Sequence, residues 1–247
     1  MSDKSPPVFF LPAAAWREPI ELLGTEATHA VRVLRLAPGD SLRLIDGAGR
    51  TGLCRIERVG KNRLHLLLIE ERLVSPPATR LHLAPAFSKS ARRGYLIEKA
   101  AELGAFGLIF WKAARSQGDM PDAPKDSWLA QATAGAKQSA SAYVPRLDTA
   151  PSLAALIARA ESFDARFVAL EPAYGATTPT PGDLSRPGDV VLVLGPEGGL
   201  TPGEAETLLQ AGFAPLSLGP SVLRLETAAL AALSLWHWAR ALPQPRP

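Results

Sequence analysis

Two glycine-containing segments in the last quarter of the chain constrain its fold more than any other feature. Each follows an apolar run: residues 192–194 lead into Gly195-Pro196-Glu197-Gly198-Gly199, and residues 215–218 lead into Gly219-Pro220. Because glycine has no Cβ, its backbone can come close to a ligand that side chains would keep away. A single cluster of this kind is equally typical of an ordinary turn between a strand and a helix.

The first segment does not have the composition of a phosphate-binding loop, since it lacks the lysine and Ser/Thr of a P-loop and does not fit the pattern G-x-G-x-x-G. A third segment, Leu170-Glu171-Pro172, again places a proline within a few residues of the end of an apolar run. Proline ends strand pairing and leaves backbone groups free to bind a flat, uncharged ring such as adenine. Ligands of α/β sheets bind beyond the carboxyl ends of the strands, so we expect the three segments to converge on one pocket.

The chain of 247 residues, 47% of them apolar, can form one large domain or two modest ones. Short apolar runs alternate with turn signals in the first part, which predicts strands over residues 8–11, 41–45, 52–56 and 63–69 of a small β-barrel. The segment Ser75-Pro76-Pro77-Ala78 interrupts this pattern. We therefore predict domains over residues 1–75 and 78–247.

The second part alternates strands and helices, which is typical of an α/β domain. We expect strands over residues 80–86, 107–111, 166–170, 190–194 and 215–218, and helices over 88–103, 127–139, 153–160 and 226–242. Another helix is expected to begin at the capping box Thr201-Pro202-Gly203-Glu204 and to end at Gly212.

Charge and cysteine content narrow the function classes. The net charge is only +3, but residues 78–146 hold 10 basic and 5 acidic side chains, a surplus that suits several phosphates. The single cysteine permits no internal disulfide, and residues 1–8 lack the order of a signal peptide, so we expect a cytoplasmic protein. The longest uncharged stretch, residues 227–239, is too short to span a membrane, and no histidine or cysteine spacing indicates a metal.

The motifs together resemble one family. The glycine segments occur with Lys99-Ala100-Ala101-Glu102-Leu103-Gly104, Arg115-Ser116, Gln138-Ser139 and, near the N-terminus, His29-Ala30-Val31-Arg32-Val33-Leu34-Arg35 and Asp46-Gly47-Ala48-Gly49. In their order along the chain, these motifs resemble those of the RsmE family of 16S ribosomal RNA uracil-N3 methyltransferases. The resemblance implies an N-terminal PUA-like β-barrel that binds RNA, followed by an α/β SPOUT domain with a trefoil knot, which dimerises through the knot region.

The resemblance also implies S-adenosylmethionine as cofactor and 16S RNA of the small ribosomal subunit as partner, with no metal and no membrane. The expected cofactor-binding residues lie in the three glycine and proline segments: Leu170, Glu171, Leu194, Gly195, Pro196, Gly198, Gly199, Leu218, Gly219, Val222, Leu223, Thr227 and Ala228. The expected RNA contacts are His29, Arg32, Arg35, Lys89, Arg92, Arg93, Lys99 and Arg115. For His29, packing beside a barrel strand is the alternative.

Three charged residues are candidates for catalysis. Methylation of N3 of uracil requires removal of a weakly acidic proton, so a cation that favours the uracil anion and a base are useful. Arg224 is the candidate cation, with an ion pair to Glu226 or Glu197 as the alternative role. Glu197 and Glu226 are candidate bases or orienting acceptors. Glu226 can instead stabilise the free amides at the start of its helix, and Glu197 can fix its own loop.

Two positions depart from the family pattern. Ser141 stands where the family usually has arginine, and Leu225 stands where it usually has threonine. Two alternatives therefore stay open: an RNA-binding ribosome-assembly factor that has lost catalysis, and a SPOUT methyltransferase that acts on another RNA position.

Overall fold

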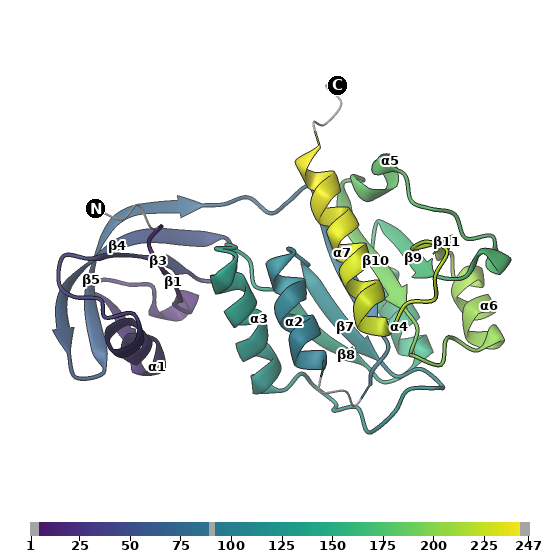
Figure 1. Ribbon diagram of the computed structural model, residues 1–247, viewed down its shortest axis with the longest axis horizontal. Helices are drawn as coiled ribbons and strands as arrows, with labels where there is room; N and C mark the ends of the chain where they lie inside the picture. Colours follow the sequence, from purple (N-terminus) through teal and green to yellow (C-terminus); the bar gives the residue numbers. More distant parts are fainter. Residues whose placement is uncertain (1–4, 89–91, 243–247) are drawn as a thin grey trace. The chain divides into compact units, whose positions relative to one another are not determined.

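The computed structural model describes residues 5–88 and 92–242 (Figure 1). The chain divides into two compact units. Unit 1 holds the residues up to Pro76 together with Ala136–Val144, and unit 2 holds Pro77–Gly135 together with the residues from Pro145 onward.

Unit 1 is a five-stranded sheet around an apolar core. Its strands are β1 (Val8–Phe10), β2 (Ile20–Leu23), β3 (Ser41–Ile45), β4 (Arg50–Gly60) and β5 (Arg63–Leu73), in the order β1-β3-β4-β5-β2. Strand β1 runs parallel to β3, and the other pairs are antiparallel. Alternate residues of neighbouring strands point into the core, as the period of two requires: Leu42, Leu44, Cys54, Ile56, Leu64 and Leu66.

The β-rich pattern of the first part is confirmed, but two strands are longer than predicted. Strands β4 and β5 extend past the predicted ranges, and their pairing shifts register between Leu53 and Cys54 and between Ile56 and Arg58. Such bulges let a long strand bend around a core. Strand β2 was not predicted, and neither was the short helix α1 (Gly24–Thr28), which continues into a π-helical turn over His29–Val33.

Residues 136–144 belong to unit 1, although they lie within the second predicted domain, residues 78–247. The amide of Gly49 donates to the carbonyl of Ala142 at 3.0 Å, and the amide of Val144 donates to that of Gly47 at 3.0 Å. The hydroxyl of Tyr143 donates to the carbonyl of Val74 at 2.7 Å. Gly47 has a φ of 79°, and a Cβ there would lie 2.9 Å from Cγ2 of Val144. The predicted turn at 46–49 is therefore the place where this later segment packs.

Unit 2 contains a six-stranded sheet in which every neighbouring pair is parallel. Its strands are β6 (Thr79–Pro85), β7 (Gly107–Trp111), β8 (Arg146–Ala150), β9 (Ala165–Ala169), β10 (Gly188–Leu194) and β11 (Ala214–Leu216). The order is β11-β9-β10-β6-β7-β8. From β6 the chain adds β7 and then β8 on one side of the sheet. Strands β9, β10 and β11 lie on the other side of β6, with β10 next to it. The connections after β6 and after β10 therefore run in opposite directions, and the boundary between these two strands is a topological switch point.

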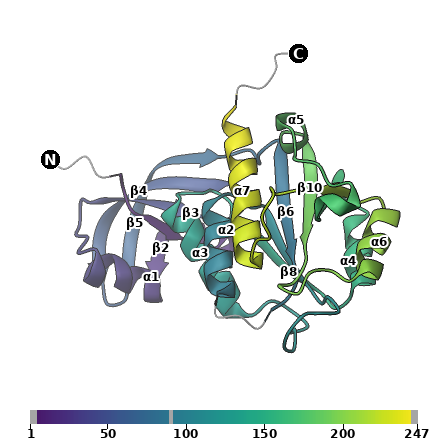
Figure 2. The ribbon, with the colours of Figure 1, turned by 45° about the vertical axis from the view of Figure 1, so that its right-hand side comes forward.

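Helices cover both faces of this sheet (Figures 1 and 2). Helices α2 (Arg93–Glu102), α3 (Asp126–Gln138) and α7 (Leu225–Ala241) lie on one face, where Trp128 packs on Phe110 and Trp236 on Phe167. Helices α4 (Leu153–Ala160) and α6 (Pro202–Gln210) pack on the other face against Val191 and Val193. The short helix α5 (Pro181–Leu184) and a 3₁₀ turn at Pro172–Tyr174 lie between β9 and β10.

The predicted α/β alternation is confirmed with small shifts. The helix expected from Ser88 begins at Arg93, and residues 89–91 lie outside the described residues. The capping box is confirmed: Oγ1 of Thr201 accepts from the amide of Glu204, and the Glu204 carboxylate accepts from the amide of Thr201. Strand β8 was not predicted.

Candidate ligand pocket and active site

The three loops singled out in the sequence follow adjacent strands. Strands β11, β9 and β10 are neighbours and parallel, so the loops that follow them lie at the same edge of the sheet. The segments after β9 and β11 are also joined by hydrogen bonds. The amide of Leu170 donates to the carbonyl of Leu216 at 3.1 Å, and the amide of Ser217 donates to that of Thr177 at 2.9 Å. The three segments therefore lie at one edge of the sheet, while their convergence on one ligand pocket stays a prediction.

The glycines of these loops serve different physical needs. Gly199 and Gly219 have φ values of 71° and 122°, which side-chain-bearing residues rarely adopt. Gly195 is needed for packing, because a Cβ there would lie 3.0 Å from Cγ of Leu200. At Gly198 a Cβ would have ordinary contacts, the nearest being Cδ of Arg115 at 3.4 Å.

Arg115 braces the loop that follows β10. Its Nη1 donates to the carbonyl of Gly198 at 2.6 Å. The neighbouring amide of Ala114 donates to Oε1 of Glu204 at 2.7 Å, so the capping carboxylate of α6 also holds the segment that follows β7. Arg115 was predicted as an RNA contact, and the structure places it against the predicted cofactor loop.

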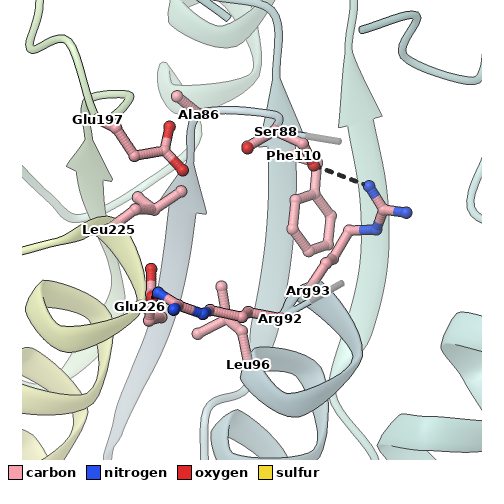
Figure 3. A pocket seen from close by; sticks show the side chains of 9 residues that line it. All are labelled: Ala86, Ser88, Arg92, Arg93, Leu96, Phe110, Glu197, Leu225 and Glu226. Atoms are coloured by element: carbon pink, nitrogen blue, oxygen red, sulfur yellow. Dashed lines mark hydrogen bonds and ion pairs between the residues drawn. The ribbon is translucent and has the colours of Figure 1, made fainter. Parts of the chain in front are cut away.

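A pocket opens at the switch point between β6 and β10 (Figure 3). Its walls come from the segment after β6, the start of α2, strand β7, the loop after β10 and the start of α7; they are Ala86, Ser88, Arg92, Arg93, Leu96, Phe110, Glu197, Leu225 and Glu226. The side chains of Leu96, Phe110 and Leu225 make it apolar, while arginines and glutamates supply charge. The pocket thus suits a flat ring with polar edges.

Arg92 and Glu226 form an ion pair in this pocket. Glu226 lies in the first turn of α7, where its carboxylate accepts a hydrogen bond from its own backbone amide. This bond, with the Arg92 guanidinium beside it, holds the pKa of Glu226 below its usual range. The alternative role predicted for Glu226, stabilising free amides at the helix start, is thus observed. Among the described residues no ion pair joins Arg224 to Glu226 or Glu197, the two alternative partners predicted for it, although the charge of Arg224 also helps to lower the pKa of Glu226.

Arg93 lines the same pocket and is partly buried. Its guanidinium carbon lies 5.0 Å from the ring centre of Phe87 and 4.8 Å from that of Trp128. Its Nη1 donates to the carbonyl of Ser88 at 2.9 Å, and burial lowers its pKa. Arg93 therefore fixes the segment after β6, and contact with RNA stays a prediction for this residue.

Four further predicted residues lie in three places: near the start of α7, on α2 and in unit 1. Arg224 is the N-cap of α7 and is exposed, and Val222, two residues earlier, is 91% exposed. Lys99 pairs with Glu102 at 2.6 Å on the surface of α2. In unit 1, His29 packs edge-on against Phe9, as the alternative for this residue expects. Lys89 lies outside the described residues.

The other two predicted RNA contacts, Arg32 and Arg35, lie in unit 1 and are accessible to solvent. Arg32 belongs to the π-helical turn, and Arg35 follows it with a φ of 58°. Both are exposed, as are the apolar Val33 and Leu34 between them. A surface of this kind suits phosphates flanking an unpaired base.

The two departures from the family pattern have clear structural surroundings. The hydroxyl of Ser141 donates to the carbonyl of Tyr143 at 2.8 Å and closes a turn in unit 1. Leu225 is buried and forms part of the pocket wall. The walls made by Leu96 and Phe110 were not predicted, because in the sequence both residues are typical of ordinary core positions in a helix and a strand.

Nothing in the described part of the chain suggests a membrane span or a metal centre. No helix there is long and apolar enough to cross a bilayer. No three His, Cys, Asp or Glu side chains gather there in a way that could hold a metal ion.

Comparison with known proteins finds a matching family model for most of each unit. A family model described as an RNA methyltransferase domain matches residues 75–237, and one described as an RNA methyltransferase PUA domain matches residues 22–69. Ribosomal RNA small subunit methyltransferase E of Mycobacterium tuberculosis is 35% identical over 216 residues, covering 85% of this chain and 82% of the relative. The protein of the same name from Bacillus subtilis is 32% identical over 225 residues, covering 86% and 87%.

Solved structures agree. Ribosomal RNA small subunit methyltransferase E from Neisseria gonorrhoeae, bound to S-adenosyl methionine, is 25% identical with a TM-score of 0.80, covering 93% of this chain and 96% of that one. A probable rRNA-methyltransferase from Porphyromonas gingivalis is 30% identical with a TM-score of 0.80, covering 95% and 98%. The expected architecture, a PUA-like barrel followed by an α/β SPOUT-type domain, is confirmed.

Proposed function

Because the chain belongs to the ribosomal RNA small subunit methyltransferase E family, we propose that it transfers a methyl group from S-adenosylmethionine to N3 of one uridine in 16S ribosomal RNA. The observation that carries this proposal is the position of the pocket. It lies at the topological switch point, and its wall includes Glu197 of the loop after β10 and Leu225, the first residue of α7, which follows the loop after β11. A ring bound in the pocket therefore lies beside the proposed cofactor loops.

The residues of the three loops fit S-adenosylmethionine. Adenine is flat and uncharged, and the loops offer backbone groups and apolar side chains to such a ring. Val222 supports this proposal, because an apolar side chain that is 91% exposed in the loop between β11 and α7 suits a surface that a ligand covers. The cofactor contacts proposed here are those named from the sequence, with Leu218, Gly219 and Leu223 in the loop after β11.

The reaction requires the N3 proton of uracil to leave and the methyl group to move from sulfur to nitrogen. When bound, S-adenosylmethionine supplies an electrophilic methyl group on a sulfonium. N3 of uracil loses its proton and attacks the methyl carbon, the carbon–sulfur bond breaks, and 3-methyluridine, S-adenosylhomocysteine and a proton result. The chain's own residues orient the uracil ring between Leu96, Phe110 and Leu225 and keep water from it.

Three charged residues are proposed to assist. Glu197 faces the pocket from the loop after β10 and is the proposed acceptor for the N3 proton. Glu226 is held as a carboxylate, which makes it a weak base and a better orienting group. Arg224, exposed at the N-cap of α7, is proposed to stabilise negative charge near the cofactor.

The proposal extends to partners and setting. Unit 1 binds the RNA through Arg32 and Arg35, and the protein acts in the cytoplasm during ribosome biogenesis.

The chain threads through β9, β10 and β11 as a trefoil knot, which the placement of β10 between β9 and β6 supports. Two copies associate through this region.

Primer extension tests the proposal on its natural substrate. Small ribosomal subunits that lack the modification are incubated with the protein, with and without S-adenosylmethionine. Because a methyl group on N3 blocks Watson–Crick pairing, reverse transcriptase is expected to stop beside one uridine of 16S RNA, only when the cofactor is present. Binding of RNA and cofactor without any stop would instead support the assembly factor that has lost catalysis.

A further inference from the structure

The turn that carries Glu197 is held in place by Arg115. The amide of Gly199 donates to the carbonyl of Pro196 at 2.8 Å and closes this turn, and Figure 3 shows the Glu197 side chain at the wall of the pocket. Nη1 of Arg115 donates to the carbonyl of Gly198 at 2.6 Å. The guanidinium therefore helps to set where the turn, and with it Glu197, lies beside the pocket.

The backbone that presents Arg115 is itself fixed. The amide of Ala113 donates to Oγ of Ser116 at 3.0 Å, and the amide of Ser116 donates to the carbonyl of Ala113 at 3.0 Å. The amide of Ala114 donates to Oε1 of Glu204 at 2.7 Å, which ties the segment to the start of α6. Because its neighbours are anchored in this way, only the side chain of Arg115 has to be ordered for it to brace the turn.

Arg115 and Lys112 are two cations that form no ion pair within the described residues. The exposed Arg115 donates to the neutral carbonyl of Gly198, and Nζ of Lys112 donates to that of Gly118 at 2.6 Å. A guanidinium has five N–H donors in one plane, so the bond to Gly198 leaves an edge for a second acceptor. An exposed edge of this kind suits a phosphate, which a guanidinium binds with two parallel hydrogen bonds.

A phosphate on that edge changes the cost of ordering the Arg115 side chain. An exposed arginine loses much rotamer freedom when it is fixed, and the first ligand to bind meets this loss. The second ligand then binds to a side chain that is already ordered. A phosphate at Arg115 and a cofactor at the turn therefore strengthen each other's binding, and they do so by the same factor.

On the basis of the proposed function, which supplies both ligands, we propose that Arg115 bridges the carbonyl of Gly198 and a phosphate of the substrate RNA, so that RNA and S-adenosylmethionine bind cooperatively. Arg115, predicted from the sequence as an RNA contact, is then also a positioning residue. It acts through the turn, and it orders Glu197 and the cofactor loop when the RNA is bound.

The linkage between the two ligands tests this role. Fluorescence anisotropy measures the affinity of N-terminally labelled protein for small subunits that lack the modification, without cofactor and with saturating S-adenosylhomocysteine, which has no methyl group to transfer. For the wild type we expect the affinity for subunits to rise about ten-fold when S-adenosylhomocysteine is present. For Arg115→Ala we expect weaker binding and no rise, because the bridge is absent.

Two further variants separate the bridge from charge alone. Arg115→Lys keeps the charge but has no planar fork, so it should retain most of the affinity without cofactor and lose most of the rise. Lys112→Ala is the matched control, since Lys112 lies on the same segment but donates to Gly118 rather than to the turn, and its rise should equal that of the wild type. Circular dichroism and titration with S-adenosylhomocysteine alone show that each variant is folded and saturated.

A wild type that binds subunits equally well with and without S-adenosylhomocysteine would overturn the inference, and so would an undiminished rise in Arg115→Ala. Loss of the rise in Lys112→Ala as well would trace the effect to charge alone and also overturn the bridge. The proposed function fails on a different readout, the absence of 3-methyluridine when the wild type is given S-adenosylmethionine. Cooperative binding without that product would contradict the proposed reaction, and the product without cooperative binding would contradict the bridge.

Discussion

Gly195 and Gly198 are three residues apart, yet their surroundings differ sharply. A Cβ at Gly195 would press on Leu200, a residue packed against the core of unit 2. Gly198 has room for a methyl group and its φ is not in the left-handed region. Gly195 is thus constrained by packing within the protein, whereas at Gly198 we expect the proposed ligand, rather than packing, to require a bare backbone.

Alanine at the two glycines separates these reasons. We expect Gly195→Ala to destabilise the protein by about 1–2 kcal/mol, the range of modest overpacking. Gly198→Ala should leave stability within about 0.5 kcal/mol and weaken binding of S-adenosylmethionine. Urea unfolding and calorimetric titration measure the two quantities. Unchanged cofactor affinity in a stable Gly198→Ala variant would place the cofactor elsewhere.

Helix α6 fixes two of the segments around the candidate site through the residues at its start. Its capping box fixes the end of the loop after β10, and its Glu204 also reaches the segment that follows β7. Because Thr201 supplies one of the two capping bonds, Thr201→Ala is expected to lower the free energy of unfolding by about 1 kcal/mol. Urea denaturation checks this value, with Thr207→Ala on the exposed side of the same helix as control. Equal effects of the two variants would contradict the capping argument.

Local chemistry made this and several other elements predictable. Thr201-Pro202-Gly203-Glu204 encodes its cap within four residues, and the ranges of β3, β7 and α4 were predicted without error because clear apolar runs and turns bound them. Strand β8 was missed because it is an edge strand of mixed polarity, paired only with β7. The packing of residues 136–144 in unit 1 and the ion pair of Arg92 depend on distant residues, which local patterns do not reveal.

The whole molecule should lose stability as the pH falls below 6.5. His82 is buried, and its Nε2 lies 3.0 Å from Oδ1 of Asp189, a carboxylate that also pairs with Arg80. Burial lowers the pKa of His82 from 6.5, although Asp189 opposes the shift. Below pH 6.5 the unfolded chain therefore binds a proton that folded His82 resists, and unfolding becomes easier.

A variant isolates this effect. His82→Gln keeps a hydrogen-bond donor near Asp189 but does not titrate, so its stability should change less than that of the wild type between pH 7 and pH 5. Denaturant unfolding at several pH values measures the difference. Identical slopes in the two proteins would show that His82 contributes nothing to acid sensitivity.

Association is the other prediction at this scale. We expect a homodimer that involves α7, because Trp238 is 52% exposed on a helix whose neighbour Trp236 is buried. Trp238→Glu should weaken the dimer while leaving the fold intact, since the side chain already contacts solvent. Light scattering at micromolar concentration reports the mass. A wild-type monomer would contradict the expectation.

Nucleoside mass spectrometry of 16S RNA tests the central claim most directly. Small subunits that lack the modification are treated with the protein and isotope-labelled S-adenosylmethionine, and the RNA is digested to nucleosides. The account predicts labelled 3-methyluridine and no other labelled nucleoside. A label on ribose or on another base would contradict the assignment of N3 and point to a different RNA position.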